Sequence, residues 1–156
     1  MNLQETKEEV LKGVFELYKD NPNGLYDITE AIEECGQDHY EFGKYLVNNG
    51  WVRNHQYQGT RFVCQISIEG IEEVAPDYFE THVNTAIGAL GIIGGKQSAT
   101  EILGFEPADI QKVRDIVEHL KTTGHIEDPH YFGTDVLIEL SLYGRDHYER
   151  NKASFH

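Results

Sequence analysis

The sequence has few cysteines, few basic residues and no long apolar run, and each shortage excludes a class of protein. Of its 156 residues, two are cysteine, 13 are lysine or arginine and 27 are aspartate or glutamate. No apolar segment approaches the roughly 20 residues that a helix needs to cross a bilayer. The N-terminus MNLQETKEEV lacks the basic and apolar regions of a signal peptide. We therefore expect a cytoplasmic protein without a membrane partner.

The cysteines and histidines do not form a pattern typical of a metal site. Cys35 falls at helical spacing and Cys64 at strand spacing within apolar segments, so both are expected to be core residues. His119, His125 and His130 come nearest to a cluster, but their spacing matches no zinc motif. We predict no metal and no cofactor.

Catalytic motifs are also missing. The sequence has neither a Gly-x-Ser-x-Gly elbow nor a catalytic Cys/His context. The glycine-rich segment 88–97 has Leu90 where a phosphate-binding loop needs its first glycine, and Gln97 where it needs Ser or Thr. We therefore expect a protein without enzymatic activity.

The net charge of −14 is distributed along the whole chain. Residues 1–76 carry 6 basic and 14 acidic residues, and residues 77–156 carry 7 and 13. Such a chain repels phosphate backbones and anionic membranes at long range. The charge therefore favours a protein partner over a nucleic acid.

An internal repeat dominates the sequence. At an offset of 74 residues the C-terminal parts of the two halves align without a gap, including three glycines and the Ser-[Ile/Leu]-x-Gly element. The aligned pairs are Leu46/Leu120, Gly50/Gly124, Val52/Ile126, Tyr57/Tyr131, Gly59/Gly133, Thr60/Thr134, Ser67/Ser141 and Gly70/Gly144. Upstream, Asp27 aligns with Ser98 at an offset of 71, so the second copy has three extra residues before its third helix.

The helices of the first copy follow from periodicity and caps. Residues 5–20 predict an amphipathic helix. Asp27, with Glu30 three residues later, is expected to cap a short second helix, and Asp38 to cap a third that ends at Gly50.

A two-stranded hairpin is expected to complete the first copy. Residues 62–68 alternate between apolar and polar types, and Gly70 is expected to close the hairpin.

The second copy predicts the same order. Its elements are a helix over 78–93, a second helix capped by Ser98, a third helix with Pro107 in its first turn, strands near 125–128 and 135–142, and a short helix near 143–150. The third helix is expected to bury a stripe of Ile110, Val113, Ile116, Val117 and Leu120.

The order helix, helix, helix, hairpin, together with Leu-x-x-x-Gly-[Trp/His]-[Val/Ile] before the hairpin, resembles winged helix-turn-helix regulators of the MarR and PadR type. The resemblance covers nearly the whole chain, once per copy. It implies an α+β, mainly α, fold of two winged-helix units in tandem. We expect the first over residues 1–75 and the second over 76–156, with a short C-terminal helix and a tail.

In DNA-binding winged helices the third helix enters the major groove and the wing contacts the DNA backbone or minor groove. The third helices here offer His39, Tyr40, Lys44, Lys112, Arg114 and Lys121, among several acidic residues. The alternative interpretation is an ordinary solvated helix face.

The first wing is the exception to the acidic charge. Residues 51–65 contain Arg53, His55, Tyr57 and Arg61 and no acidic residue, which resembles a nucleic-acid contact. The alternative is an ordinary hairpin with two exposed arginines. The second wing has Tyr131 with acidic neighbours.

Gly88 and Gly91 lie inside a predicted helix, where each costs about 1 kcal/mol relative to alanine. We expect the compensation to be close packing of another helix, either between the two copies or across a homodimer.

Two functions follow. The first is a protein-interaction module that binds a partner, with a basic one favoured by charge complementarity. The second is a DNA-binding transcription regulator, which the net charge opposes and which the usual activity of this fold supports by analogy.

Overall fold

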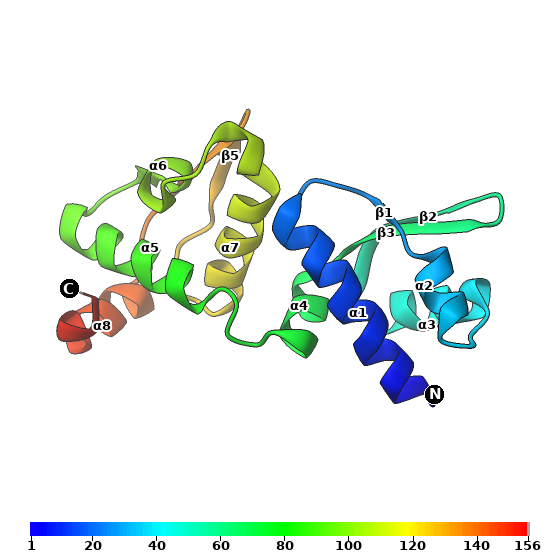
Figure 1. The fold of residues 1–156 in the computed structure, drawn as a ribbon. Helices are drawn as coiled ribbons and strands as arrows, with labels where there is room; N and C mark the ends of the chain where they lie inside the picture. The colour runs from blue at the N-terminus through cyan, green and yellow to red at the C-terminus, as the bar shows by residue number, and fades with distance from the viewer. Residues whose placement is uncertain (156) are drawn as a thin grey trace. The chain divides into compact units, whose positions relative to one another are not determined.

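The computed structural model describes residues 1–155 and has an α+β architecture that is mainly helical (Figure 1). The chain divides into two compact units, Met1–Tyr78 and Phe79–His156. Each unit contains one small three-stranded antiparallel sheet. The elements of the two units follow in the same order, as the sequence repeat predicts.

Unit 1 begins with a long helix and ends with a short one. Its elements are α1 (Leu3–Asp20), β1 (Tyr26–Asp27), α2 (Thr29–Glu34), α3 (His39–Asn48), β2 (Val52–Gln58), β3 (Arg61–Ile66) and α4 (Ile68–Val74). The strand order is β1-β3-β2, so β3 is central. In Figure 1 the β2–β3 hairpin extends beyond α2 and α3.

Unit 2 repeats this order with an added turn before its third helix. Its elements are α5 (Glu80–Ile93), β4 (Gln97–Ser98), α6 (Ala99–Leu103), η1 (Pro107–Asp109), α7 (Ile110–Thr122), β5 (His130–Phe132), β6 (Asp135–Ile138), α8 (Leu142–Arg150) and η2 (Lys152–Phe155). The strand order is β4-β6-β5. Within the part of the chain that the structure describes, no helix combines the length and apolar character that crossing a membrane requires.

Each unit has its own core, built from the faces that periodicity predicts. The apolar face of α1 is buried throughout, and α7 buries four of its five predicted residues, whereas Ile110 stays partly exposed. The fully buried residues include Leu11, Ile32, Leu46, Phe62 and Ile66 in unit 1 and Ile87, Leu90, Ile116, Leu120 and Ile138 in unit 2.

The two short strands β1 and β4 were not predicted, and β1 changes the role expected of Asp27. The second helix begins at Thr29 with Ile28 at the N-cap position, so the predicted capping box of Asp27 and Glu30 is wrong. Asp27 pairs instead with Val63 in the sheet, and its carboxylate accepts a hydrogen bond from the Thr29 amide at 3.0 Å. The carboxylate thus still satisfies an amide in the first turn, where negative charge is favoured.

The predicted role of Gly70 as the end of the hairpin is also wrong, because a helix begins there. Ser67 is the N-cap of α4 and accepts a hydrogen bond from the Gly70 amide. Its hydroxyl donates to the carbonyl of Gly50 at 2.5 Å, and its amide donates to the carbonyl of Trp51 at 3.0 Å. One serine therefore joins the start of α4 to the segment that follows α3.

Unit 2 repeats this serine bridge. The Ser141 hydroxyl donates to the Gly124 carbonyl at 2.5 Å, its amide donates to the His125 carbonyl at 3.0 Å, and its oxygen accepts from the Gly144 amide. A Cβ added at Gly70 would collide with the Trp51 carbonyl, and one added at Gly144 would collide with the His125 carbonyl. The Ser-[Ile/Leu]-x-Gly repeat is therefore a helix start that requires glycine for close backbone approach.

Gly88 and Gly91 pack within unit 2. A Cβ at Gly91 would collide with the Tyr148 ring of α8, and a Cβ at Gly88 would lie 3.1 Å from Cβ of Phe155. The close neighbour expected of these glycines is thus the C-terminal segment of the same unit. Neither the other repeat nor a second copy of the chain is needed to explain them.

The β2–β3 hairpin contains a bulge. The register shifts between Arg53 and Gln56, and Asn54 adopts a positive φ of 54°. The side-chain Nδ2 of Asn54 donates a hydrogen bond to the side-chain oxygen of Gln65 on β3 at 2.7 Å, which holds the bulge in place. A bulge of this kind bends the strand and increases its twist.

We predict opposite effects for two helical glycines of unit 1. Gly70→Ala should destabilise the protein by about 1–3 kcal/mol, because the added methyl group forces α4 away from the Trp51 carbonyl. Gly13→Ala is the control: no atom lies within 4 Å of its Cβ position, so it should stabilise α1 by about 0.5–1 kcal/mol. Urea unfolding measures both, and equal stability of the two variants would contradict the close approach.

Candidate recognition surface

In unit 1, α3 and the hairpin bring two exposed tyrosines together. Tyr40 and Tyr57 are 48% and 37% exposed, and their ring centroids lie 5.1 Å apart. The Tyr57 hydroxyl donates to the Tyr40 carbonyl at 3.3 Å, which ties the hairpin to α3. His55 extends the cluster, with its ring centroid 6.1 Å from that of Tyr57. Exposed aromatic rings held in this way are typical of protein-binding surfaces.

The exposed basic residues of this surface each lie beside a carboxylate. The Lys44 ammonium is 4.5 Å from the centroid of the Tyr40 ring and 3.6 Å from the Glu41 carboxylate. A guanidinium nitrogen of Arg61 is 3.8 Å from the Asp27 carboxylate. Such exposed pairs contribute little stability. They nevertheless place negative charge where a phosphate would have to bind.

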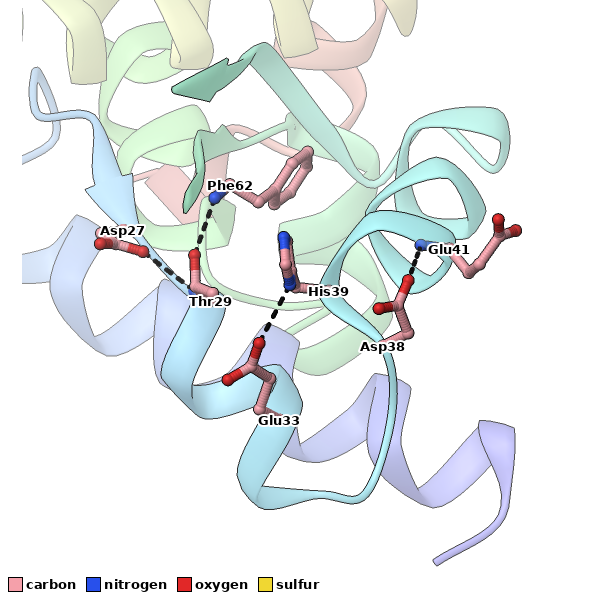
Figure 2. A network of polar contacts seen from close by, with 7 residues as sticks. All are labelled: Asp27, Thr29, Glu33, Asp38, His39, Glu41 and Phe62. Atoms are coloured by element: carbon pink, nitrogen blue, oxygen red, sulfur yellow. Dashed lines mark hydrogen bonds and ion pairs between the residues drawn. The ribbon is translucent and has the colours of Figure 1, made fainter. Parts of the chain in front are cut away.

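Figure 2 shows how α2 and α3 hold their acidic side chains. His39 Nδ1 lies 3.0 Å from the Glu33 carboxylate, so this histidine faces α2 rather than a partner. Asp38 accepts a hydrogen bond from the Glu41 amide at 2.9 Å, which confirms the predicted cap of the third helix.

The same view shows the link between α2 and the hairpin. The Thr29 hydroxyl accepts a hydrogen bond from the Phe62 amide at 2.7 Å, while the Thr29 amide donates to Asp27. The hydrogen bonds from Thr29 lower the pKa of Asp27, and Arg61 lowers it further. Asp27 therefore stays ionised beside Arg61 at neutral pH.

Arg53 differs from the other predicted wing residues. It is half-buried, and its Nε atom is buried. His55, Tyr57 and Arg61 are exposed. The β2–β3 hairpin of unit 1 thus presents one arginine and aromatic side chains to solvent, rather than the two exposed arginines that the sequence suggested.

Unit 2 presents an aromatic surface at the corresponding place. The Tyr131 hydroxyl donates to the Glu118 carboxylate at 3.1 Å, and the Arg114 guanidinium lies 5.7 Å from the Tyr131 ring centroid. Burial and the charge of Glu118 raise the pKa of Tyr131 to about 12, so its hydroxyl remains a donor. Phe132 beside it is 53% exposed. Sequence reasoning missed Phe132, although its exposure follows from its place at the wing tip.

The other predicted basic residues of α7 lie beside side chains other than Tyr131. Lys112 is half-buried with its ammonium 5.2 Å from the Phe105 ring centroid, and Lys121 lies 4.0 Å from the Asp128 carboxylate.

In both units an acidic side chain links the short first strand to the central strand of the sheet. The acidic residue lies on the first strand in unit 1 and on the central strand in unit 2. In unit 1 the acid is Asp27 on β1, opposite Arg61 of β3. In unit 2 it is Asp135 on β6, which accepts hydrogen bonds from the hydroxyls of Ser98 and Thr100 at 2.5 and 2.8 Å. Burial of Asp135 raises its pKa, but these hydrogen bonds outweigh that effect and lower it overall.

A pocket of about 220 Å³ opens at the α5–α8 contact of unit 2. Its volume is below the roughly 300–1,000 Å³ that is typical of small-molecule sites. The lining residues are Leu90, Gly91, Gly94, Gly95, Leu140, Arg145, Tyr148 and Glu149.

The cysteines lie apart from the aromatic surfaces. Cys64 is buried in β3, and burial raises the pKa of its thiol to about 12, which makes it unreactive. Cys35 is half-buried and unbonded to Cys64. Over residues 1–155, no three His, Cys, Asp or Glu side chains gather so as to hold a metal ion.

Two histidines pack together in unit 2. The ring centroids of His125 and His147 lie 4.9 Å apart, and Nε2 of His125 is buried without a hydrogen-bond partner. Burial lowers the pKa of His125, and the charges of His147 and His119 lower it further. His125 is the counterpart of Trp51 in unit 1.

We predict that unit 2 loses stability on mild acidification. The folded-state pKa of His125 is below its ordinary value of 6.5, so the neutral ring contributes to the stability of the folded state. This contribution to stability is complete above pH 6.5 and is lost as the pH falls and the ring is protonated. His125→Trp should reduce the loss of thermal stability between pH 7 and pH 5. Part of the loss of thermal stability should remain in this variant, because burial and Lys112 also lower the pKa of His82. An identical pH dependence in the variant and the wild-type protein would refute the role of His125.

Comparison with known proteins identifies no relative on which a function could be based. No family model matches the chain, and no curated protein or solved structure matches it.

Proposed function

We propose that the chain consists of two winged-helix units in tandem. Three helices followed by a hairpin, repeated with the same serine bridge in each unit, support this proposal. The third strand beside the hairpin and the close packing of the third helix on the unit core agree with it. Under this proposal α3 and α7 are the recognition helices, and the β2–β3 and β5–β6 hairpins are the wings.

We propose further that these units bind protein and have no enzymatic activity. The observation that carries this proposal is the pairing of three exposed cations of the recognition surfaces with carboxylates. Lys44, Arg61 and Lys121 each lie within 4.0 Å of a carboxylate of their own unit. A phosphate would have to displace these carboxylates, whereas a protein partner can use the exposed tyrosines directly.

DNA-binding regulation is the second candidate function. The absence of acidic residues from 51–65, with His55 and Arg61 exposed on the wing, favours it. One exposed arginine releases few counterions, so any such contact would be weak. The net charge of −14 opposes it further.

Fluorescence anisotropy of a labelled random duplex tests the choice. We predict no binding at low or physiological salt, because the paired carboxylates repel phosphates. The double variant Asp27→Asn/Glu41→Gln removes the partners of Arg61 and Lys44 and should raise DNA affinity measurably. Tight, strongly salt-dependent binding by the wild-type protein would instead establish the regulator function.

We also predict that the exposed tyrosines of unit 1 are needed to capture a partner protein. A Tyr40→Ala/Tyr57→Ala bait should lose a protein that the wild-type bait retains from a lysate of the source organism, because exposed aromatic residues dominate binding energy. The control bait Leu3→Ala/Leu17→Ala removes comparably exposed apolar residues of α1 and should retain it. Equal recovery with all three baits would show that the wing surface is not the contact.

A further inference from the structure

We propose that each unit carries its own docking site for a basic peptide segment, centred on Tyr57 in unit 1 and on Tyr131 in unit 2. One chain then binds two such segments. This inference rests on the proposed protein-binding function and specifies the chemistry and the number of its sites.

The two sites share one construction. Tyr57 and Tyr131 occupy equivalent positions of the repeat, on the first strand of each hairpin. Each donates its hydroxyl to the third helix of its unit, Tyr57 to the carbonyl of Tyr40 and Tyr131 to the carboxylate of Glu118. Both rings remain more than one third exposed. The hydrogen bond fixes each ring in place, which lowers the entropy lost when a partner binds.

Both sites already hold a cation from their own chain. The Lys44 ammonium lies over the ring of Tyr40 in unit 1, and the Arg114 guanidinium lies over the ring of Tyr131 in unit 2. Each cation is thus held against a tyrosine face at the junction of helix and wing. A ring that accepts a cation from within the chain can accept one from a partner by the same interaction.

The charge around the rings is complementary to a basic segment. Residues 26–66, which form the helices and hairpin around Tyr57, contain six acidic and three basic residues. Residues 97–138, around Tyr131, contain eight and three. The Glu41 carboxylate, 3.6 Å from Lys44, and the Glu118 carboxylate, 3.1 Å from the Tyr131 hydroxyl, would attract lysine and arginine side chains and repel an acidic segment. The neighbouring apolar surface, Phe132 in unit 2 and Tyr40 in unit 1, suits aliphatic side chains between the basic ones.

The test is a titration of the full chain with a short labelled peptide of alternating arginine and leucine, followed by calorimetry and anisotropy. We expect two peptides per chain. Tyr57→Ala and Tyr131→Ala should each weaken one of the two sites by about tenfold, and the double variant should weaken both. Tyr143→Ala, which removes an exposed tyrosine of α8, should leave the stoichiometry at two. Circular dichroism establishes that each variant is folded.

Two further variants separate docking from a general effect of charge or folding. Tyr57→Phe keeps the ring and loses the hydroxyl that holds it against α3, so it should weaken its site less than Tyr57→Ala does. Lys44→Met removes the cation that occupies the aromatic cluster and should tighten peptide binding more than Lys12→Met, which makes the same charge change on the exposed surface of α1. Equal tightening by the two lysine variants would show that only net charge matters, and would overturn the proposal.

The outcomes distinguish this proposal from the proposed function. A failure of the arginine–leucine peptide to bind, or binding that the tyrosine variants leave unchanged, overturns the basic-segment docking sites. The protein-binding function still stands in that case if the duplex does not bind and the Tyr40/Tyr57 bait loses its partner. Tight duplex binding overturns the proposed function itself.

Discussion

Each unit depends on one serine that joins the segment after its third helix to the start of its last α-helix. Ser67 and Ser141 each use the hydroxyl as donor and acceptor at once and add a backbone hydrogen bond beside it. Because the strand before the serine and the helix after it both leave from this point, the direction of the hairpin relative to the third helix is set here. The position of the aromatic surface follows from that direction.

Local sequence patterns were sufficient for the helices and insufficient for this bridge. The stripes on α1 and α7 and the caps at Asp38 and Ser98 were predicted because each involves residues within a few positions of one another. The alternation of residues 62–68 continues through Ser67, so it favoured a strand. The segment instead starts a helix, capped by Ser67 and tied to a carbonyl 17 residues earlier that no local pattern reveals.

The recognition surface shows the same limit. Its residues and its acidic surroundings were evident from composition and from the repeat, but the partners of its cations were not. Arg61 meets Asp27 only because β1, a two-residue strand without a periodic signal, pairs with β3. Similarly, no local motif predicts the half-burial of Arg53 or the bulge that follows it. The count of charged residues therefore predicted the sign of the surface charge. It did not predict which cations are available to a partner.

The bulge in β2 has a consequence for self-association. β2 lies at the edge of its sheet, so its outer backbone groups could template another strand and lead to aggregation. The shift of register after Arg53 and the left-handed conformation of Asn54 interrupt the regular spacing that such pairing requires. The exposed side chains of His55, Gln56 and Gln58 are polar, so Tyr57 is the one exposed aromatic residue that this strand offers to a second chain. The exposed edge of the hairpin therefore does not favour strand pairing with a second copy of the chain.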